Sequence, residues 1–174
     1  MSRAGLRLFY ALWPDEATRA ALQTWQAQLP DGRAVVPANL HLTLVFLGQQ
    51  PAAALPSLQA LPSRYADFDC ALTLDRLGCF RRQGVVWAGM RETPPAMDGL
   101  QRALRQAVVE QGVAVPEEHG AFVPHVTLVR NAATLPDMER EGKRPPIVWR
   151  ARRVVLAESV VQPGGAVYRV LASS

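Results

Sequence analysis

Lysine, cysteine and histidine are all scarce in this sequence of 174 residues. Lys143 is the only lysine, so arginine carries nearly all of the positive charge behind the net charge of +4. Arginine binds phosphate oxygens well, but so small an excess permits an anionic partner without establishing one. Cys70 and Cys79 have the spacing of neither a zinc knuckle nor a redox pair, and we expect them to be small, buried and reduced.

Long hydrophobic runs and low-complexity segments are also missing. No stretch approaches the roughly 20 apolar residues of a membrane-spanning helix. The apolar run 8–13 is broken at Pro14, too early for the core of a secretion signal. The 14 prolines are spread along the chain and punctuate loops. We therefore expect a cytoplasmic protein without a membrane anchor, folded over residues 1–174 as a single domain.

The hydrophobic pattern predicts a mixture of strands and helices. Asp15 is placed to cap the first helix, Gly112 to end the last one, and 78–84 resembles a basic turn. We expect helices at 15–29, 51–61 and 95–112, and strands at 6–12, 40–47, 68–77, 85–90, 122–129, 147–161 and 166–171. This order indicates an α+β fold with hairpins, not regular βαβ units.

Two of the three histidines begin nearly the same five-residue phrase. The first phrase, HLTLV, begins at His41, and the second, HVTLV, begins at His125, 84 residues later. A repeat at about half the chain length suggests an internal duplication. One H-x-T phrase in a strand is more often a packed histidine than a catalytic one, but packing alone does not explain two copies. His119 lacks the pattern, and we expect it to be a solvated loop residue.

Strand geometry gives each phrase two different faces. Because side chains alternate along a strand, the histidine and the threonine two residues later point the same way. The opposite face of each phrase is apolar and is expected to pack in the core; its residues are Leu42, Leu44 and Phe46 in the first copy and Val126 and Leu128 in the second. If the two strands lie side by side, two imidazoles and two hydroxyls converge on one pocket.

Such a pocket has the groups that opening of a cyclic phosphodiester needs. Histidine titrates near pH 6.5, so one ring can act as a base while the other acts as an acid. A bell-shaped pH dependence with an optimum near neutrality follows. Thr43 and Thr127 are suited to donate hydrogen bonds to phosphate oxygens. No cluster of Asp, Glu and His has metal-ligand spacing, so we expect no metal and no cofactor.

At these residues the sequence resembles the two-histidine phosphoesterase superfamily, and within it the RNA 2',3'-cyclic phosphodiesterases, also called 2'-5' RNA ligases. The flanks of both phrases resemble the family motifs, over 39–48 and 122–130. The likeness extends over nearly the whole chain. It includes the opening strand 6–12, a central hairpin at 78–80 and 86–89, and a closing hairpin with Glu158, Ser159, Gly165 and Tyr168.

This resemblance implies a fold and a reaction. The fold would be α+β and bilobal, with two pseudo-symmetric antiparallel-sheet lobes flanked by helices and the active site in the cleft between them. The reaction would be metal-independent hydrolysis of RNA 2',3'-cyclic phosphate ends to a 2'-phosphomonoester, with 2'-5' ligation as its reverse. His41 would be the proton donor and His125 the proton acceptor, while Thr43 and Thr127 would bind phosphate. The partner would be RNA with a cyclic end, tRNA fragments among them, and the protein a monomer.

Two further residues are candidate substrate contacts. Arg130 ends the second motif, but strict alternation would place it opposite His125, so it needs a bulge or must reach around the strand end. Phe9 could stack on a base or belong to the core. Arg81, Arg82 and Arg144 could guide the RNA backbone or be ordinary surface charges.

Alternative functions remain open at this point. The same chemistry could act on a small cyclic nucleotide or on ADP-ribose cyclic phosphate. The region after Asn131 is short and carries Pro136, Pro145 and Pro146, which leaves the substrate size undecided. A non-catalytic RNA-binding module would have no need for two proton-transfer groups.

Overall fold

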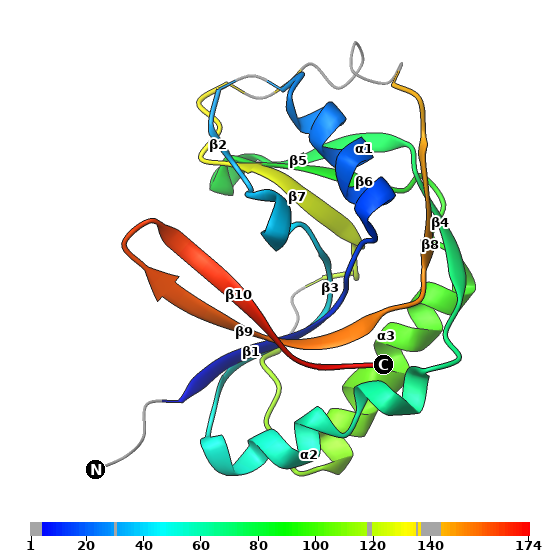
Figure 1. Cartoon of the computed structure of the whole chain (residues 1–174), viewed down its shortest axis with the longest axis vertical. Helices are drawn as coiled ribbons and strands as arrows, with labels where there is room; N and C mark the ends of the chain where they lie inside the picture. Colours follow the sequence, from blue (N-terminus) through cyan, green and yellow to red (C-terminus); the bar gives the residue numbers. More distant parts are fainter. Residues whose placement is uncertain (1–4, 30, 118–119, 135, 137–143) are drawn as a thin grey trace.

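The computed structural model describes residues 5–29, 31–117, 120–134, 136 and 144–174 (Figure 1). The α-helices in this part of the chain are α1 (Glu16–Gln26), α2 (Leu55–Gln59) and α3 (Pro95–Glu110). The strands are β1 (Leu6–Leu12), β2 (Arg33–Ala34), β3 (Leu42–Gln50), β4 (Cys70–Leu74), β5 (Arg76–Phe80), β6 (Val85–Gly89), β7 (His125–Arg130), β8 (Ile147–Ala151), β9 (Val154–Gln162) and β10 (Gly165–Ser173).

The strands form one large and one small sheet, and every pairing among them is antiparallel. The large sheet has eight strands in the order β10-β9-β1-β3-β7-β6-β5, with β2 also paired to β7. The small sheet consists of β4 and β8. The predicted α+β class with hairpins is therefore confirmed.

The large sheet has a narrow junction at its centre. Strands β3 and β7 are joined through one residue pair, Leu42 with Val126. We call β10-β9-β1-β3 the first half-sheet and β7-β6-β5 with β2 the second half-sheet. Each half is internally well paired, for example along the whole length of β1 against β3. The junction matters because its two residues directly follow the two motif histidines.

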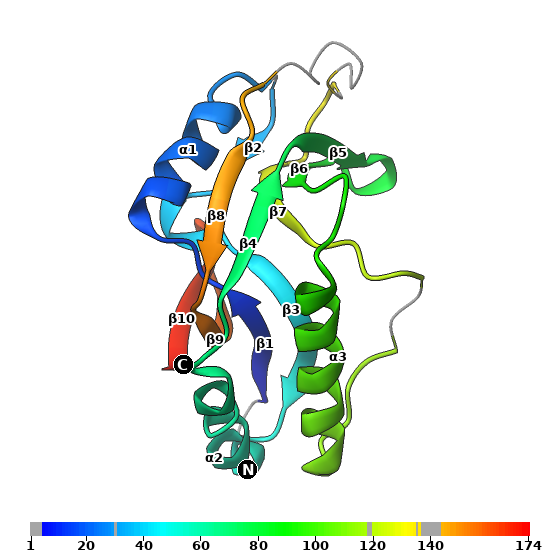
Figure 2. The ribbon, with the colours of Figure 1, turned by 90° about the vertical axis from the view of Figure 1, so that its right-hand side faces the viewer.

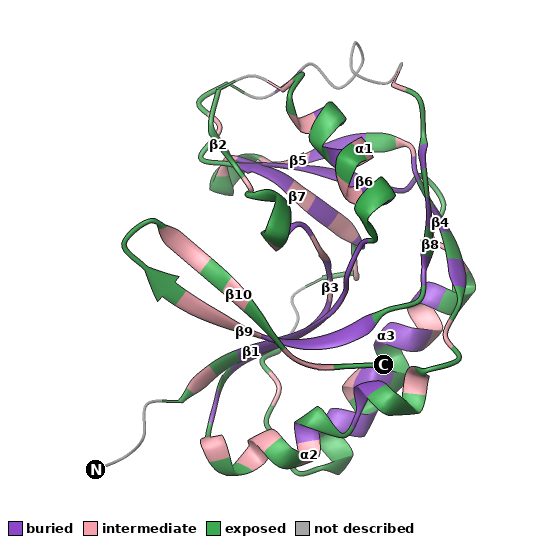
Figure 3. Cartoon of the chain, viewed as in Figure 1, coloured by how far each residue is buried: buried purple, intermediate pink, exposed green. Residues whose placement is uncertain are grey.

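Helices cover the two half-sheets on separate sides of the molecule (Figures 1 and 2). Helix α1 packs against β7 and β8, α3 against β3, and α2 against β10. The buried faces of β1, β3, β7 and β9 meet these helices in one apolar core, whereas the β9–β10 turn extends away from it (Figure 3). The core residues between sheet and helices include Leu8, Tyr10, Leu22, Leu42, Leu104 and Leu128.

Several predicted elements are confirmed closely. The strand at 6–12 has the predicted bounds, and the Asp15 side chain accepts a hydrogen bond from the Thr18 amide at 2.7 Å as the N-cap of α1. Helix α3 ends at Glu110, two residues before Gly112, whose φ of +72° suits a helix terminus.

Two predicted strands are wrong because the chain changes sheets within them. The region 147–161 is divided between β8 in the small sheet and β9 in the large sheet. The region 68–77 is divided in the same way between β4 and β5, so the basic turn shortens to Arg81–Gly84. Hydrophobic alternation continues across both breaks, which is why the pattern does not reveal them. The β3 strand also runs past Gly48, where we expected it to end.

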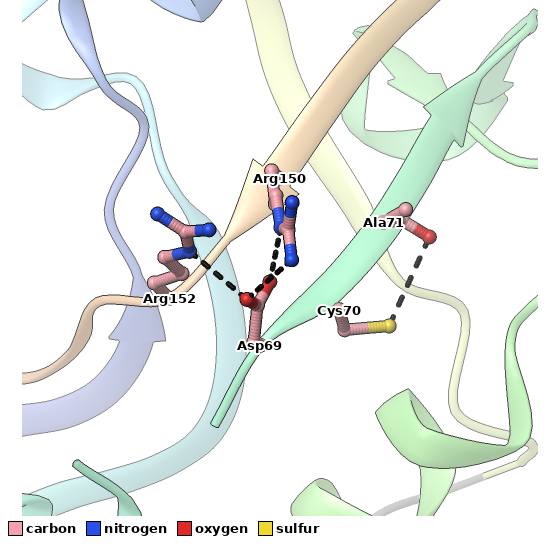
Figure 4. Close-up of polar contacts among 5 residues, drawn as sticks. All are labelled: Asp69, Cys70, Ala71, Arg150 and Arg152. Atoms are coloured by element: carbon pink, nitrogen blue, oxygen red, sulfur yellow. Dashed lines mark hydrogen bonds and ion pairs between the residues drawn. The ribbon is translucent and has the colours of Figure 1, made fainter. Parts of the chain in front are cut away.

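A cluster of surface charges joins the start of β4 to the end of β8 (Figure 4). The Arg150 guanidinium donates two hydrogen bonds to the Asp69 carboxylate, at 2.7 and 2.8 Å, and Arg152 donates a third at 3.1 Å. These bonds lower the pKa of Asp69, with the Arg150 contact as the main cause. Exposed ion pairs of this kind contribute little to stability.

The structure bears on two further predictions, which concern the cysteines and membrane-spanning helices. Cys70 is buried and Cys79 half-buried, and both are free thiols. Among the described residues, no helix is long and apolar enough to cross a membrane.

Candidate active site

The two motif histidines lie on either side of the sheet junction. His41 immediately precedes β3, and His125 is the first residue of β7. The pairing of Leu42 with Val126 therefore brings the two phrases together in antiparallel order. Continuing this register places Thr43 beside His125, and these two residues do line one hollow.

Each imidazole is tethered to the backbone in the same way. The Nδ1 atom of His41 lies 2.7 Å from the carbonyl oxygen of Asn39, and that of His125 lies 2.7 Å from the carbonyl oxygen of Val123. A carbonyl can only accept, so Nδ1 carries the proton in both rings and Nε2 is left for chemistry. The His41 Nε2 lies 3.0 Å from the Thr43 hydroxyl.

Aromatic side chains enclose both rings. Trp13 stacks on His41 with 5.4 Å between ring centroids, and Phe9 and Tyr168 complete the enclosure at 4.9 and 5.0 Å. The His41 imidazole has little freedom to rotate, because these rings pack around it and the backbone holds its Nδ1.

The His125 ring is held by a second aromatic pair. Phe80 meets it edge-on at 5.1 Å, and Trp87 lies at 5.7 Å. The Trp87 indole covers Gly78, where a Cβ atom would come within 2.1 Å of the ring. Only glycine at this position permits the indole to lie there, so Gly78 indirectly supports His125.

Matching β-bulges lie three residues after each histidine. In β3 the pairing shifts from Thr43–Ala11 to Val45–Tyr10, which leaves the residue between, Leu44, as the extra one. In β7 it shifts from Thr127–Trp87 to Val129–Val86, which leaves Leu128 as the extra one. A bulge inserts one residue and so reverses the face of every residue beyond it.

The bulges correct the expectation for Phe46 and decide between the two routes given for Arg130. Phe46 was expected in the core but is 39 % exposed, on the same side as His41 and Thr43. Arg130 occupies the equivalent position in β7 and lines the hollow that contains His41. Of the two routes by which Arg130 could reach the site, a bulge or a reach around the strand end, the structure has the bulge.

Two adjoining hollows open at the histidines. The first has a volume of about 360 Å³ and is lined by His41, Thr43, Arg130, Phe9 and Tyr168 among others. The second has a volume of about 330 Å³, and its lining includes His125 and Phe80. Thr43 and Phe46 border both hollows, so the two hollows form one continuous depression. Thr127 is half-buried in β7 and lines neither hollow.

Both imidazoles are less basic than free histidine. Burial is the main cause that lowers the pKa of His41, to about 4; the positive charge of Arg130 lowers it further, as does His125 when it is protonated. Burial and Arg130 also lower the pKa of His125. The hydrogen bonds to the backbone carbonyls act in the opposite direction but do not overcome burial. Without a bound anion, both rings are therefore neutral at pH 7.

The remaining sequence candidates lie at different distances from this depression. Phe9 is 4 % exposed and touches His41, so its position is that of a packing residue at the wall. Arg81 and Arg82 are exposed in the β5–β6 turn beside Phe80. Arg144 lies away from the histidines, where its Nε donates to the Gln28 side chain at 3.2 Å. His119 lies outside the described residues.

Some site residues were missed by the sequence analysis. Trp13 appeared only as the end of an apolar run, Phe46 was assigned to the core, and Tyr168 appeared only as part of a family hairpin. The side chain of Asn39 was missed as well: its amide donates to the Ala166 carbonyl at 2.8 Å, and its oxygen accepts from the Tyr168 amide at 3.4 Å. Asn39 thus joins strand β10 to the segment that holds His41. Among the described residues, no group of three or more His, Cys, Asp or Glu side chains could hold a metal ion.

Residues 13–162 match the family model described as the 2'-5' RNA ligase superfamily. The chain belongs to this superfamily. The chain is 33 % identical over 180 residues to the RNA 2',3'-cyclic phosphodiesterase of Thermus thermophilus, covering 95 % of this chain and 88 % of that protein. It is 37 % identical over 130 residues to that of Escherichia coli, covering 73 % of each chain. The crystal structure of E. coli LigT in apo form superposes with a TM-score of 0.80 at 31 % identity, covering 99 % of this chain and 98 % of LigT.

Proposed function

We propose that residues 1–174 form a single, bilobal domain that hydrolyses RNA 2',3'-cyclic phosphate ends to a 2'-phosphomonoester without a metal. The two half-sheets would be its pseudo-symmetric lobes, and the depression at their junction its active site. One observation carries the proposal: the two rings are tethered identically through Nδ1, on either side of the Leu42–Val126 pair, with both Nε2 atoms left for chemistry. The homologues over most of the chain are RNA 2',3'-cyclic phosphodiesterases.

The proposed reaction uses one ring as a base and the other as an acid. The Nε2 atom of His125 takes a proton from water while the water oxygen attacks phosphorus. The bond from phosphorus to the 3' oxygen breaks, and the protonated Nε2 of His41 gives its proton to that oxygen. The 2' ester bond remains, so the product is a 2'-phosphomonoester. Solvent then restores the two protonation states, and the reverse sequence would join RNA ends through a 2'-5' bond.

The surrounding groups stabilise charge on the phosphate in this proposal. The hydroxyls of Thr43 and Thr127 donate to the non-bridging oxygens, and the Arg130 guanidinium lies where it can offset their negative charge. The assignment of His41 as donor and His125 as acceptor follows the resemblance to the family. In the described structure the His41 Nε2 lies 3.0 Å from the Thr43 hydroxyl, whereas the His125 Nε2 forms no such bond.

The deciding assay is incubation with an RNA that ends in a 2',3'-cyclic phosphate, in excess EDTA, with identification of the product ends. We expect a 2'-phosphate and an undiminished rate. Loss of activity on chelation that Mg²⁺, Mn²⁺ or Zn²⁺ restores would contradict the acid–base mechanism. A 3'-phosphate product would mean that the other ester bond breaks.

A small nucleotide substrate is the second candidate. E. coli LigT has been crystallised with 3'-AMP and with phosphate, so a related protein binds ligands as small as a mononucleotide. Running the same assay with cyclic mononucleotides and with ADP-ribose cyclic phosphate separates the two candidates by kcat/KM.

A further inference from the structure

A third hollow adjoins the one that contains His41, beside the turn between β9 and β10. Its volume is about 110 Å³. Arg130, Ala166 and Tyr168 border both this hollow and the His41 hollow, so the two are neighbours across Arg130. A group bound here would lie next to the reacting phosphate and would not occupy its place.

The charge of this hollow is entirely positive in the described structure. Arg33 of β2 and Arg130 of β7 are direct cross-strand partners, and both side chains are exposed. Neither forms an ion pair with a described residue, and no carboxylate is among the described residues that line the hollow. Like charges opposite one another destabilise a strand pair, so this arrangement is most stable with an anion between the guanidinium groups.

The walls of the hollow are fixed by the backbone. Gly165 has a φ of +122°, and a Cβ atom there would lie 3.3 Å from the Arg33 guanidinium. Glycine therefore lets the hairpin turn approach Arg33 closely. On the opposite wall, the Asn39 side chain holds the Ala166 carbonyl at 2.8 Å. The two arginines thus face a turn whose position is set by hydrogen bonds.

We propose that this hollow, the Arg33 subsite, binds the phosphodiester that precedes the cyclic end of an RNA substrate. The inference rests on the proposed function, because it takes the reacting phosphate to lie between the histidines. Arg130 would then lie between two consecutive phosphates of one strand, and Arg33 would contact only the upstream one. A cyclic mononucleotide has no upstream phosphodiester, so the subsite would make the protein prefer oligonucleotides.

The test compares 2',3'-cyclic AMP with a dinucleotide that ends in a 2',3'-cyclic phosphate. Arg33→Ala and Arg33→Gln should lower kcat/KM for the dinucleotide about tenfold, the effect of losing one hydrogen bond to a charged group. Neither variant should change kcat/KM for 2',3'-cyclic AMP. The slope of log kcat/KM against log salt for the dinucleotide should fall by about one. Arg102→Ala, at an exposed position of α3, is the matched control and should affect neither substrate.

A chemical control isolates the upstream phosphate. Replacing it with a neutral methylphosphonate should lower kcat/KM of the wild-type protein and abolish the difference between wild type and Arg33→Ala. An equal loss on both substrates, or no loss on either, would overturn the subsite while leaving the proposed function intact. Hydrolysis of neither substrate by the wild type would overturn the proposed function and the subsite with it. Thermal melting of each variant verifies that it is folded.

Discussion

Each of the two proposed catalytic histidines commits one ring nitrogen to the backbone, which leaves a single nitrogen for proton transfer. The tethers run to the carbonyls of Asn39 and Val123, two residues before each ring. A carbonyl that holds Nδ1 also fixes the tautomer, as in other sites where histidine acts through Nε2. The roles assigned to the two rings can therefore be tested by single substitutions that leave the strands unchanged.

His41→Ala and His125→Ala should each lower kcat by about 10² or more while the fold survives, because each removes one proton-transfer partner. The double variant should be little slower than either single one, since the two rings act as a unit. Thr43→Ala or Thr127→Ala should cost about 1–3 kcal/mol of transition-state stabilisation. Single-turnover rates with a cyclic-ended RNA measure all of these effects. His119→Ala is the control, and an inactive His119 variant would place the active site elsewhere.

Among the elements, the two bulges decide which side chains reach the site. The sequence predicted most of the strands and the shared face of His41 and Thr43, and it gave a bulge as one of two ways for Arg130 to reach the site. It could not place the bulge at Leu44 of β3, because an extra residue is defined only against a partner strand and Leu44 is as apolar as its neighbours. For the same reason Phe46 was assigned to the core, and the changes of sheet after Leu74 and Ala151 were missed.

The link between β10 and the His41 segment also belongs to this scale. Asn39→Ala removes both side-chain hydrogen bonds to β10 but keeps the carbonyl that holds the His41 ring. We expect kcat to fall about tenfold, as for a loss of roughly 1.4 kcal/mol, with a displaced alkaline limb in the pH–rate profile. Gln59→Ala is the matched control, because Gln59 also donates to β10, at the Leu171 carbonyl 3.1 Å away, far along the strand from His41. If both substitutions changed kcat and the pH–rate profile equally, Asn39 would have only a structural role.

For the whole molecule, burial of both rings shifts the expected pH dependence. The sequence alone predicted an optimum near neutrality, but the pKa values of His41 and His125 are both lowered in the free protein. Because kcat/KM reports the free enzyme, its bell should lie on the acid side of pH 6.5, and kcat/KM should fall as pH rises above it. The bell for kcat should lie at higher pH, since the bound anion raises both pKa values.

The two limbs of this profile identify the two roles. Loss of the acid removes the alkaline limb, and loss of the base removes the acid limb. With His41 as donor, His41→Ala should therefore show a rate that rises with pH to a plateau, and His125→Ala a rate that falls with pH. Profiles recorded at high enzyme concentration distinguish these shapes. The opposite pattern would exchange the roles, and an unchanged bell in both variants would exclude the two-histidine mechanism.

The neutral state of the paired rings also has a calorimetric consequence. An anion that settles between them raises their pKa values, so at pH 7 the protein must draw protons from the buffer as the anion binds. Sulfate, which does not itself titrate at this pH, is a suitable probe. The heat of binding should vary linearly with the ionisation enthalpy of the buffer, and its slope counts the protons taken up. The slope should approach zero in His41→Ala if that ring receives the proton, so that the charge of the acid arrives together with the ligand it serves.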